Sequence, residues 1–126
     1  MGGSKPARYG RRHMNEGEIY FVRLPENERK GTEIKKDRYA VIIKNFVGHA
    51  MVFVVALSTG EKRFDEPLNV PITRTVENGL TEDSVAVTYQ AFSISKERLA
   101  NKAGKLDTES FKLIKTNLRK QLGLWL

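Results

Sequence analysis

Arg38 stands at an abrupt boundary in the sequence. Before it lies PENERKGTEIKKD (25–37), which is dense in charge, and with it begins the apolar run RYAVIIKNF (38–46). A guanidinium is planar, stays protonated and can hold two oxygens of a phosphate at once. Its other common use is a surface ion pair, here with Asp37 or Glu33. The sequence around Arg38 leaves both uses open, so its neighbours in the fold must decide between them.

Two hydroxyl residues, Ser58 and Thr59, follow the next apolar run, AMVFVVALS at 50–58. The connection between the two runs, 47–49, has the length of a hairpin loop. In an antiparallel hairpin the start of one strand lies beside the end of its partner, so Arg38 is expected next to these hydroxyls. A guanidinium and hydroxyls at one edge can bind a phosphodiester. The alternative is that the hydroxyl pair simply ends a strand.

Strand composition occurs in five segments that are rich in β-branched or aromatic residues and bounded by polar or turn residues. These segments are 17–24, 38–46, 50–58, 67–72 and 84–94. The third is apolar at both parities, as expected of a strand covered on both faces. Two prolines confine the fourth to an edge or a bulge, and Asn78 with Gly79 predicts a turn before the fifth. The polar segments 25–37 and 59–66 are predicted to be exposed loops.

The chain ends in a predicted helix that Asp107 caps and Gly123 terminates. Four apolar residues recur at helical spacing and predict its buried face: Phe111, Ile114, Leu118 and Leu122. A single helical turn is expected at 95–99. Strands first and a helix last predict a mainly β, α+β fold, in which the helix packs on a small, strongly bent antiparallel sheet or barrel.

The length of 126 residues predicts one domain. The net charge of +7 would suggest a polyanionic partner if it were spread over the fold. Residues 1–13, however, hold four basic residues and no acid, and we interpret them as an expression leader or, alternatively, a disordered basic arm. The remaining 14–126 carry 18 basic and 15 acidic residues, which is only a weak indication of nucleic-acid binding.

The chain has no cysteine, which excludes disulfides, thiol catalysis and cysteine-ligated metal centres. His49 is the only histidine outside 1–13, so no metal site, cofactor or histidine-dependent catalysis is expected. No Walker loop, dinucleotide glycine motif or nucleophile elbow occurs. The longest apolar run, 50–57, is far shorter than the roughly 20 residues of a membrane helix. A cytoplasmic protein without membrane association is expected.

The order of short motifs from 17 to 124 resembles the MazF/PemK (Kid) family of toxin endoribonucleases of type II toxin–antitoxin systems. The family's opening strand corresponds to Gly17-Glu18-Ile19. Its Gly-Ser-Glu-Gln loop and the Arg-Pro-Ala-Val-Val strand that follows correspond to GTE and RYAVI. The later motifs correspond to VALST (55–59), EPLNVPI (66–72), DSVAVTYQ (83–90), and the tail segments 94–111 and 118–124. Their combined order and spacing are specific.

This resemblance implies an SH3-like antiparallel barrel of the MazF/PemK/CcdB type and a homodimer with RNA crossing the dimer face. It implies metal-independent, sequence-specific cleavage of single-stranded RNA, and a cognate antitoxin that neutralises the toxin. The family's catalytic arginine maps to Arg38 and its threonine or serine to Ser58, with Thr59 adjacent, while the loop glutamate maps to Glu33. Arg38 is assigned to the charge of the phosphorane, and protonation of the leaving oxygen is left open as a second role.

The same alignment places further residues for RNA binding. Lys36, Lys62, Arg63 and Gln90 are candidates for contacts to phosphates and bases, and Phe64 or Tyr39 for stacking. The two lysines are equally open to being solvated loop charges. The sequence departs from the family at two positions, with Tyr39 in place of the proline and Ile34 in place of the glutamine.

Two other functions remain open from the sequence. A CcdB-like toxin that binds gyrase shares this fold and carries a C-terminal tryptophan, which Trp125 matches; a tryptophan there also packs readily on a barrel. The arginine and Ser-Thr motifs, which CcdB lacks, favour the ribonuclease. A catalytically inactive binding relative is the third function, and Tyr39 is its sole indication.

Overall fold

The computed structural model describes residues 14–23 and 38–124 of the chain. Two predicted site residues, Glu33 and Lys36, lie outside these ranges, as do Trp125, the segment interpreted as a leader and the predicted loop 25–37. Within the described ranges, no helix has both the length and the apolar character that a membrane crossing needs.

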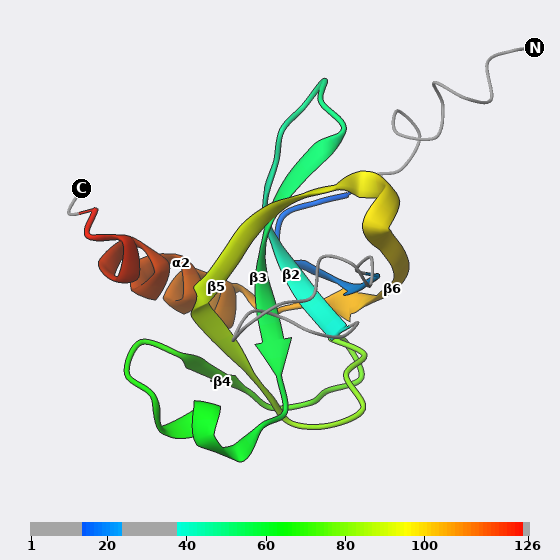
Figure 1. Cartoon of the computed structure of the whole chain (residues 1–126). Helices are drawn as coiled ribbons and strands as arrows, with labels where there is room; N and C mark the ends of the chain where they lie inside the picture. The colour runs from blue at the N-terminus through cyan, green and yellow to red at the C-terminus, as the bar shows by residue number, and fades with distance from the viewer. Residues whose placement is uncertain (1–13, 24–37, 125–126) are drawn as a thin grey trace, which may run out of the picture.

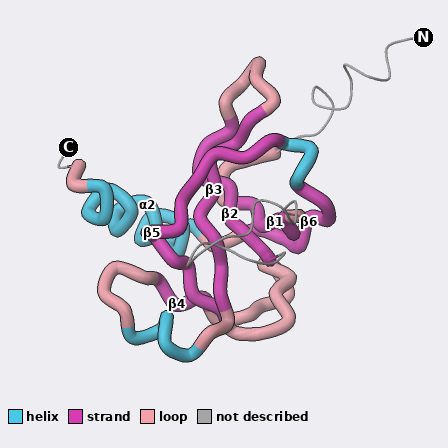
Figure 2. Tube along the Cα trace, in the orientation of Figure 1, coloured by secondary structure: helices cyan, strands magenta, loops and turns pink. Residues whose placement is uncertain are grey.

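Six antiparallel strands form one sheet in the order β4-β5-β3-β2-β1-β6 (Figure 1). The strands are β1 (Glu18–Val22), β2 (Arg38–Asn45), β3 (Met51–Ser58), β4 (Val70–Ile72), β5 (Ser84–Ser95) and β6 (Leu99–Lys105). Two 3₁₀ helices, η2 (Glu61–Asp65) and η3 (Lys96–Arg98), and one α-helix, α2 (Thr108–Leu122), complete the described chain (Figure 2). The predicted α+β class is confirmed.

Five of the strands were predicted from composition, and β4 lies at a sheet edge as its prolines require. Strand β6 was not predicted, because LANKAGK offers one large apolar residue, Leu99, and no regular alternation. It owes its conformation to pairing with β1. The predicted loop 59–66 was wrong in part, since η2 occupies most of it, whereas the helical turn expected at 95–99 is present as η3, capped by the Ser95 hydroxyl.

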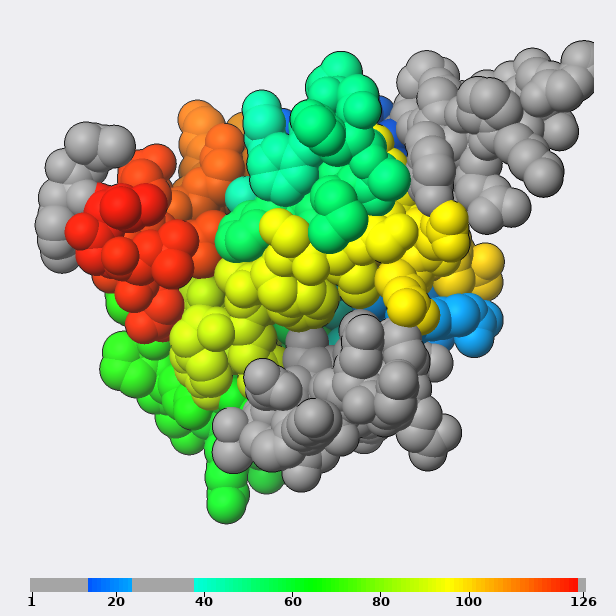
Figure 3. All heavy atoms as spheres, turned by 45° about the horizontal axis from the view of Figure 1, so that its top comes forward, coloured from blue at the N-terminus to red at the C-terminus, as the bar shows by residue number. Residues whose placement is uncertain are grey.

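The sheet is covered on both faces. Along β2 and β3, Val41 and Val55 belong to one buried cluster, which includes α2, while Ala40 and Val54 belong to a second. This alternation follows from the twofold period of a strand. It confirms that the run 50–58 is buried on both sides. Figure 3 shows the hairpin of β2 and β3 and the strand β5 forming one surface beside α2.

A wide irregularity in β5 bends the sheet. Val55 pairs with Ala91, but the next residue, Ala56, pairs with Val87, so residues 88–90 have no partner on β3. Such bulges bend a strand and re-aim its side chains. The bend carries the second half of β5 toward the hairpin end of the sheet (Figure 1).

The strand ladder does not close into a barrel, because β4 and β6 remain the two edges. The segment after β4 instead packs against the backbone of β6. The Lys105 amide donates to the Glu77 carbonyl at 2.9 Å. A Cβ added at Gly79 would lie 1.9 Å from the carbonyl oxygen of Ala103, so the two backbones are in direct contact. The gap in the barrel is therefore filled by a turn in place of a strand.

Helix α2 begins and ends at the residues that the sequence indicated. The Asp107 carboxylate accepts from the Ser110 amide at 3.0 Å, and Gly123 ends the helix with φ +73°. Ile114 and Leu118 are buried in the sheet-facing cluster. The prediction for Leu122 was wrong, since 55% of it is exposed, because the helix runs past the edge of the sheet there.

A buried carboxylate joins β1 to β6 and to the turn before β1. Glu18 is 3% exposed and accepts from the Asn15 amide at 2.9 Å, the Tyr20 hydroxyl at 3.2 Å and the Lys102 ammonium at 2.9 Å. Burial by itself raises the pKa of Glu18, but the Lys102 and Asn15 donors outweigh it, so that the pKa is lowered. The charged form is therefore the one that the fold stabilises.

We expect Glu18→Gln to reduce the free energy of unfolding by about 2–3 kcal/mol at pH 7, because Lys102 loses its charged partner. A lowered pKa stabilises the fold above the unfolded-state pKa of about 4.3, and this contribution is lost as pH falls through the folded-state value. The difference between wild type and variant in urea unfolding should therefore shrink below about pH 4. Glu16→Gln, which removes an exposed ion pair with Lys44, is the control and should cost under about 1 kcal/mol. A difference for Glu18→Gln that does not depend on pH would contradict this account.

Two glycines with similar positive φ allow backbone strain to be separated from packing. Gly79 (φ +69°) faces the β6 backbone, whereas Gly123 (φ +73°) has open space at the Cβ position. Gly123→Ala should cost about 1 kcal/mol, from the left-handed conformation alone. Gly79→Ala should cost at least about 3 kcal/mol, because the methyl group would overlap Ala103 and push the turn off β6. Equal costs in thermal unfolding would show that the turn does not close the sheet.

Candidate functional site

A hollow of about 410 Å³ lies where β2 begins and β3 ends. The register pairs Ala40 with Ala56, and continuing it by two residues places Arg38 opposite Ser58. The lining residues come from β1, β2, the end of β3 and the start of β5: Phe21, Arg38, Tyr39, Leu57, Ser58, Thr59, Gly60 and Ser84. Of the predicted site residues, the structure thus brings Arg38, Tyr39, Ser58 and Thr59 together.

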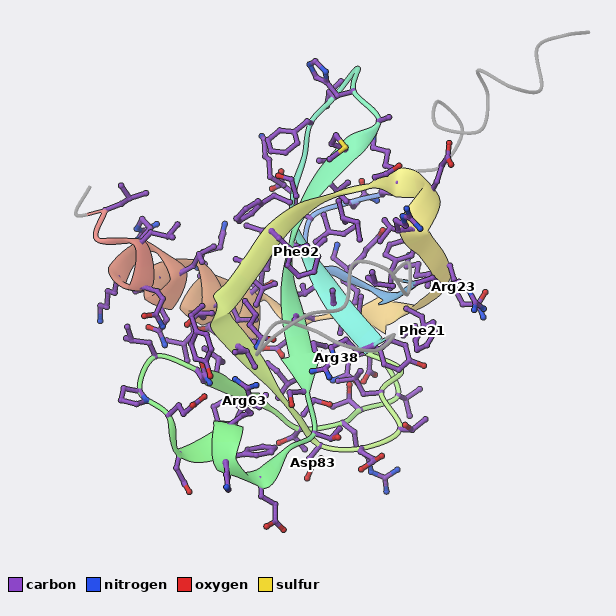
Figure 4. The ribbon with its side chains drawn as sticks, viewed as in Figure 1. Phe21, Arg23, Arg38, Arg63, Asp83 and Phe92 are labelled. Carbon is purple, nitrogen blue, oxygen red and sulfur yellow. The ribbon has the colours of Figure 1, made fainter. Side chains whose placement is uncertain are left out.

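The guanidinium of Arg38 is partly withdrawn from water, and no acidic side chain of the described residues is among the causes of its pKa shift. Its Nε is buried and, within the part of the chain that is described, has no hydrogen-bond partner. Burial lowers the pKa of Arg38, and the positive charge of Arg63 lowers it further. Arginine nevertheless stays protonated at ordinary pH. In Figure 4, Arg38 and Arg63 lie on either side of the end of β3, with Phe21 beside Arg38.

The hydroxyl of Ser58 is oriented by the backbone that follows it. Its Oγ accepts from the Gly60 amide at 3.1 Å, so that its own proton remains available to a ligand in the hollow. No Asp or Glu occurs among the described residues that line the hollow. A partly buried guanidinium and hydroxyl donors without a described carboxylate form a site for an anion with several oxygens.

One wall of the hollow is aromatic. The rings of Phe21 and Tyr39 meet edge to face, with centroids 5.2 Å apart and planes at 72°. Tyr39, which stands where the resembled family has proline, also packs against the core cluster that contains Val41. Phe21 was not predicted as a site residue. Its pairing register, Phe21 opposite Tyr39, could be found only from the β1–β2 ladder.

A second guanidinium, Arg63 on η2, lies next to the hollow and is held by a polar cluster. It donates through Nη1 to the Tyr89 hydroxyl, and the same nitrogen lies 3.9 Å from Oε1 of Glu66. The Tyr89 hydroxyl donates to that Glu66 oxygen at 2.6 Å. Burial and the Glu66 carboxylate raise the pKa of Tyr89 against the opposing effect of Arg63, so the phenol remains a donor. Neither Tyr89 nor Glu66 was predicted, because η2 was taken as a loop and its register against β5 has no sequence signal.

The other predicted RNA-binding residues that the structure describes do not line the hollow. Lys62 is exposed on η2, and Phe64, on the same short helix, is partly buried. Gln90 lies in the irregular part of β5, and its Oε1 is buried without a hydrogen-bond partner among the described residues. Glu33 and Lys36 lie outside the described residues. In the described ranges, no three His, Cys, Asp or Glu side chains are grouped to hold a metal ion.

Comparisons with known proteins identify the fold. Residues 15–122 match the family described as PemK-like, MazF-like toxin of type II toxin–antitoxin system. No curated protein matches the chain in sequence.

Three solved structures show the likeness in three dimensions. MazF from Deinococcus radiodurans is 15% identical with a TM-score of 0.71, over 86% of this chain and 96% of that one. Toxin MazF-mt6 of Mycobacterium tuberculosis is 19% identical with a TM-score of 0.68, over 86% and 99%. A mycobacterial endoribonuclease in complex with its cognate antitoxin is 21% identical with a TM-score of 0.67, over 88% and 96%. At these identities the likeness establishes a shared fold.

Removal of the Arg38 guanidinium and removal of the Arg63 guanidinium should have different effects on the free energy of unfolding. Arg38→Met keeps the apolar stem and deletes a desolvated charge, so the free energy of unfolding should stay equal to that of wild type or rise by up to about 1 kcal/mol. Arg63→Met loses the contacts to Tyr89 and Glu66 and should lower it by about 1 kcal/mol. Urea unfolding of both variants is the measurement. A clear loss of stability in Arg38→Met would mean that Arg38 is a structural ion-pair partner.

Proposed function

The chain belongs to the PemK-like, MazF-like toxins of type II toxin–antitoxin systems, and from that premise we propose that it is a metal-independent endoribonuclease that cleaves single-stranded RNA at a short sequence. The observation that carries the proposal is the buried Nε of Arg38, which has no hydrogen-bond partner among the described residues and lies in a hollow shared with Ser58. An N–H in that state can donate to a phosphate oxygen. The alternative of a gyrase-binding toxin rests on Trp125, which lies outside the described residues.

In the proposed reaction, the ribose 2′-hydroxyl attacks the adjacent phosphorus, and the bond to the 5′-oxygen of the next nucleotide breaks. The products are a 2′,3′-cyclic phosphate and a free 5′-hydroxyl. Arg38 binds non-bridging oxygens and stabilises the charge that grows on the phosphorane. Donation of a proton to the leaving oxygen is the second role proposed for Arg38.

The hydroxyls and the loop glutamate complete the proposed machinery. Ser58, oriented by the Gly60 amide, donates to a phosphate oxygen, and Thr59 is its neighbour on the rim. The 2′-hydroxyl proton needs an acceptor within hydrogen-bond reach. No described carboxylate lines the hollow, and Glu33 is therefore the proposed base.

Binding of the single strand is proposed to extend beyond the hollow. Tyr39, in the wall of the hollow, is proposed to stack on a base. Arg63 supplies a second positive charge near Arg38. Lys62 and Phe64 on η2 continue this surface, with Lys36 and Gln90 as further candidates. Unpaired bases stack on aromatic or guanidinium planes while lysines meet the phosphates.

The proposal also includes an antitoxin, a second copy of the chain in a homodimer, and a cytoplasmic location. An antitoxin is proposed because the mycobacterial endoribonuclease of similar fold was solved in complex with its cognate antitoxin. A segment rich in acidic residues would complement Arg38 and Arg63. The homodimer and the cytoplasmic location are carried over from the family resemblance.

The test is incubation of the protein with a long single-stranded RNA in EDTA, followed by mapping of cut sites and end groups. Wild type should give discrete cuts with cyclic-phosphate and 5′-hydroxyl ends. Arg38→Met should lose at least about 10²- to 10³-fold in rate, as expected when a transition-state donor is removed, while its thermal midpoint is kept. Arg119→Met, which deletes an exposed charge on α2, is the control and should cleave normally. Failure of folded wild type to cut any RNA would overturn the proposal and favour gyrase binding.

A further inference from the structure

An exposed aromatic ring stands in the irregular part of β5 and contacts Arg63, whose stem packs near Gly60 of the hollow. Tyr89 is 46% exposed and belongs to residues 88–90, which have no pairing partner on β3. Large aromatic side chains are costly to leave in water, and an ordered exposed ring is a ready stacking surface. The ring is not needed to fill the core, since neither of the two buried clusters includes it.

The plane of this ring is fixed by its neighbours. The guanidinium carbon of Arg63 lies 5.6 Å from the ring centroid, and Arg63 also donates to the Tyr89 hydroxyl. Glu66 accepts from the hydroxyl at 2.6 Å and is itself held by the Asn69 side-chain amide at 3.0 Å. Both planar groups are thus ordered before a ligand arrives, which reduces the entropy lost on binding.

The cluster that orders Tyr89 is not required to attach η2 to the sheet. Asn69, 9% exposed, already bridges the two, because its amide donates to the Arg63 carbonyl at 3.1 Å and its oxygen accepts from the Thr88 amide at 3.2 Å. The Thr88 hydroxyl donates to the Leu68 carbonyl at 3.1 Å and accepts from Gln121 of α2 at 3.0 Å. These bonds attach η2 to the sheet and to α2 independently of the contacts between Tyr89 and Arg63.

The Arg63 side chain connects the Tyr89 ring to the hollow that contains Arg38. The stem of Arg63 passes 3.8 Å from where a Cβ of Gly60 would be, and Gly60 lines the hollow that contains Arg38. Figure 4 shows Arg63 across the end of β3 from Arg38. A nucleotide whose phosphate sits at Arg38 therefore has its own or its neighbour's base within reach of Tyr89.

We propose that Tyr89 and Arg63 form a preordered platform on which one unpaired base of the RNA stacks, next to the phosphate held at Arg38. The inference rests on the proposed function for the identity of the substrate. Stacking is tolerant of base identity, so the platform positions the strand without selecting its sequence. Tyr89 is accordingly a substrate-binding residue, and Arg63 both orders it and carries charge.

The test compares Tyr89→Leu, which removes the π surface, with Tyr89→Phe and Tyr89→Trp, which keep it. RNAs that contain the mapped cleavage site are made intact and with a single abasic residue at each flanking position. Tyr89→Leu should lose about tenfold or more in kcat/KM on intact RNA, mainly through KM, the size expected for one stacked base. At one flanking position, the abasic residue should lower the kcat/KM of wild type by the same factor. It should not lower the kcat/KM of Tyr89→Leu any further, because the stacking contact is already lost. Tyr89→Phe and Tyr89→Trp should keep kcat/KM within about threefold of wild type.

The control is Val47→Ala, at an exposed position in the β2–β3 turn, at the other end of these strands from Ser58, and it should leave all rates unchanged. Thermal midpoints are measured for every variant. Two results would overturn the platform and leave the proposed ribonuclease activity standing. In the first, wild type cleaves RNA and Tyr89→Leu has the same kcat/KM. In the second, the losses caused by Tyr89→Leu and by the abasic residue are additive at every flanking position.

A binding measurement separates the two proposals. Twelve-nucleotide 2′-O-methyl RNAs, which lack the attacking hydroxyl, are titrated onto wild type and Tyr89→Leu. A dissociation constant raised about tenfold in the variant supports the platform even if wild type fails to cleave. Equal binding by both proteins, or binding by neither, would contradict it.

Discussion

The antiparallel pairing of β2 with β3 is the constraint on which the arrangement of the site depends. Its register sets the first residue of one strand against the last residue of the other, so Arg38 meets Ser58. A slip of one residue would exchange every side chain between the two buried clusters, because Val41 and Val55 face one cluster while Ala40 and Val54 face the other. The cost of exposing those apolar side chains holds the register, and the register holds the guanidinium beside the hydroxyl. The arrangement of Arg38 and Ser58 is thus maintained by apolar contacts outside the hollow.

Around this hairpin, buried polar groups of two kinds can be distinguished. Glu18 and Asn69 have their hydrogen-bonding capacity met by neighbouring donors and acceptors, and they fasten β1 to β6 and η2 to β5. Arg38 differs, because its buried Nε has no acceptor among the described residues and a second positive charge lies nearby. A satisfied polar group stabilises one conformation, whereas an unsatisfied one favours a ligand that can satisfy it. An RNA phosphate is such a ligand.

Sequence alone predicted most of the strands, because β2, β3 and β5 carry dense β-branched residues, and it placed both ends of α2 through Asp107 and Gly123. It could not predict β6, whose residues pair with β1 without an apolar pattern of their own. Arg38 and Ser58 were predicted together, since hairpin geometry follows from loop length. Tyr89, Glu66 and Phe21 were not, because their positions depend on a bulge in β5, a 3₁₀ helix and the β1–β2 register, which arise from long-range packing.

The central claim is that Arg38, whose buried Nε has no partner among the described residues, is where the fold receives an RNA phosphate. Its side-chain Nε–H resonance, assigned in ¹⁵N-labelled protein by its loss in Arg38→Met, reports that contact directly. On titration with a 2′-O-methyl RNA, the account predicts that this proton shifts downfield and exchanges more slowly with water, as a hydrogen bond to phosphate forms. If the RNA binds and perturbs other resonances while the Arg38 Nε–H stays unchanged, the phosphate lies elsewhere and the account is wrong.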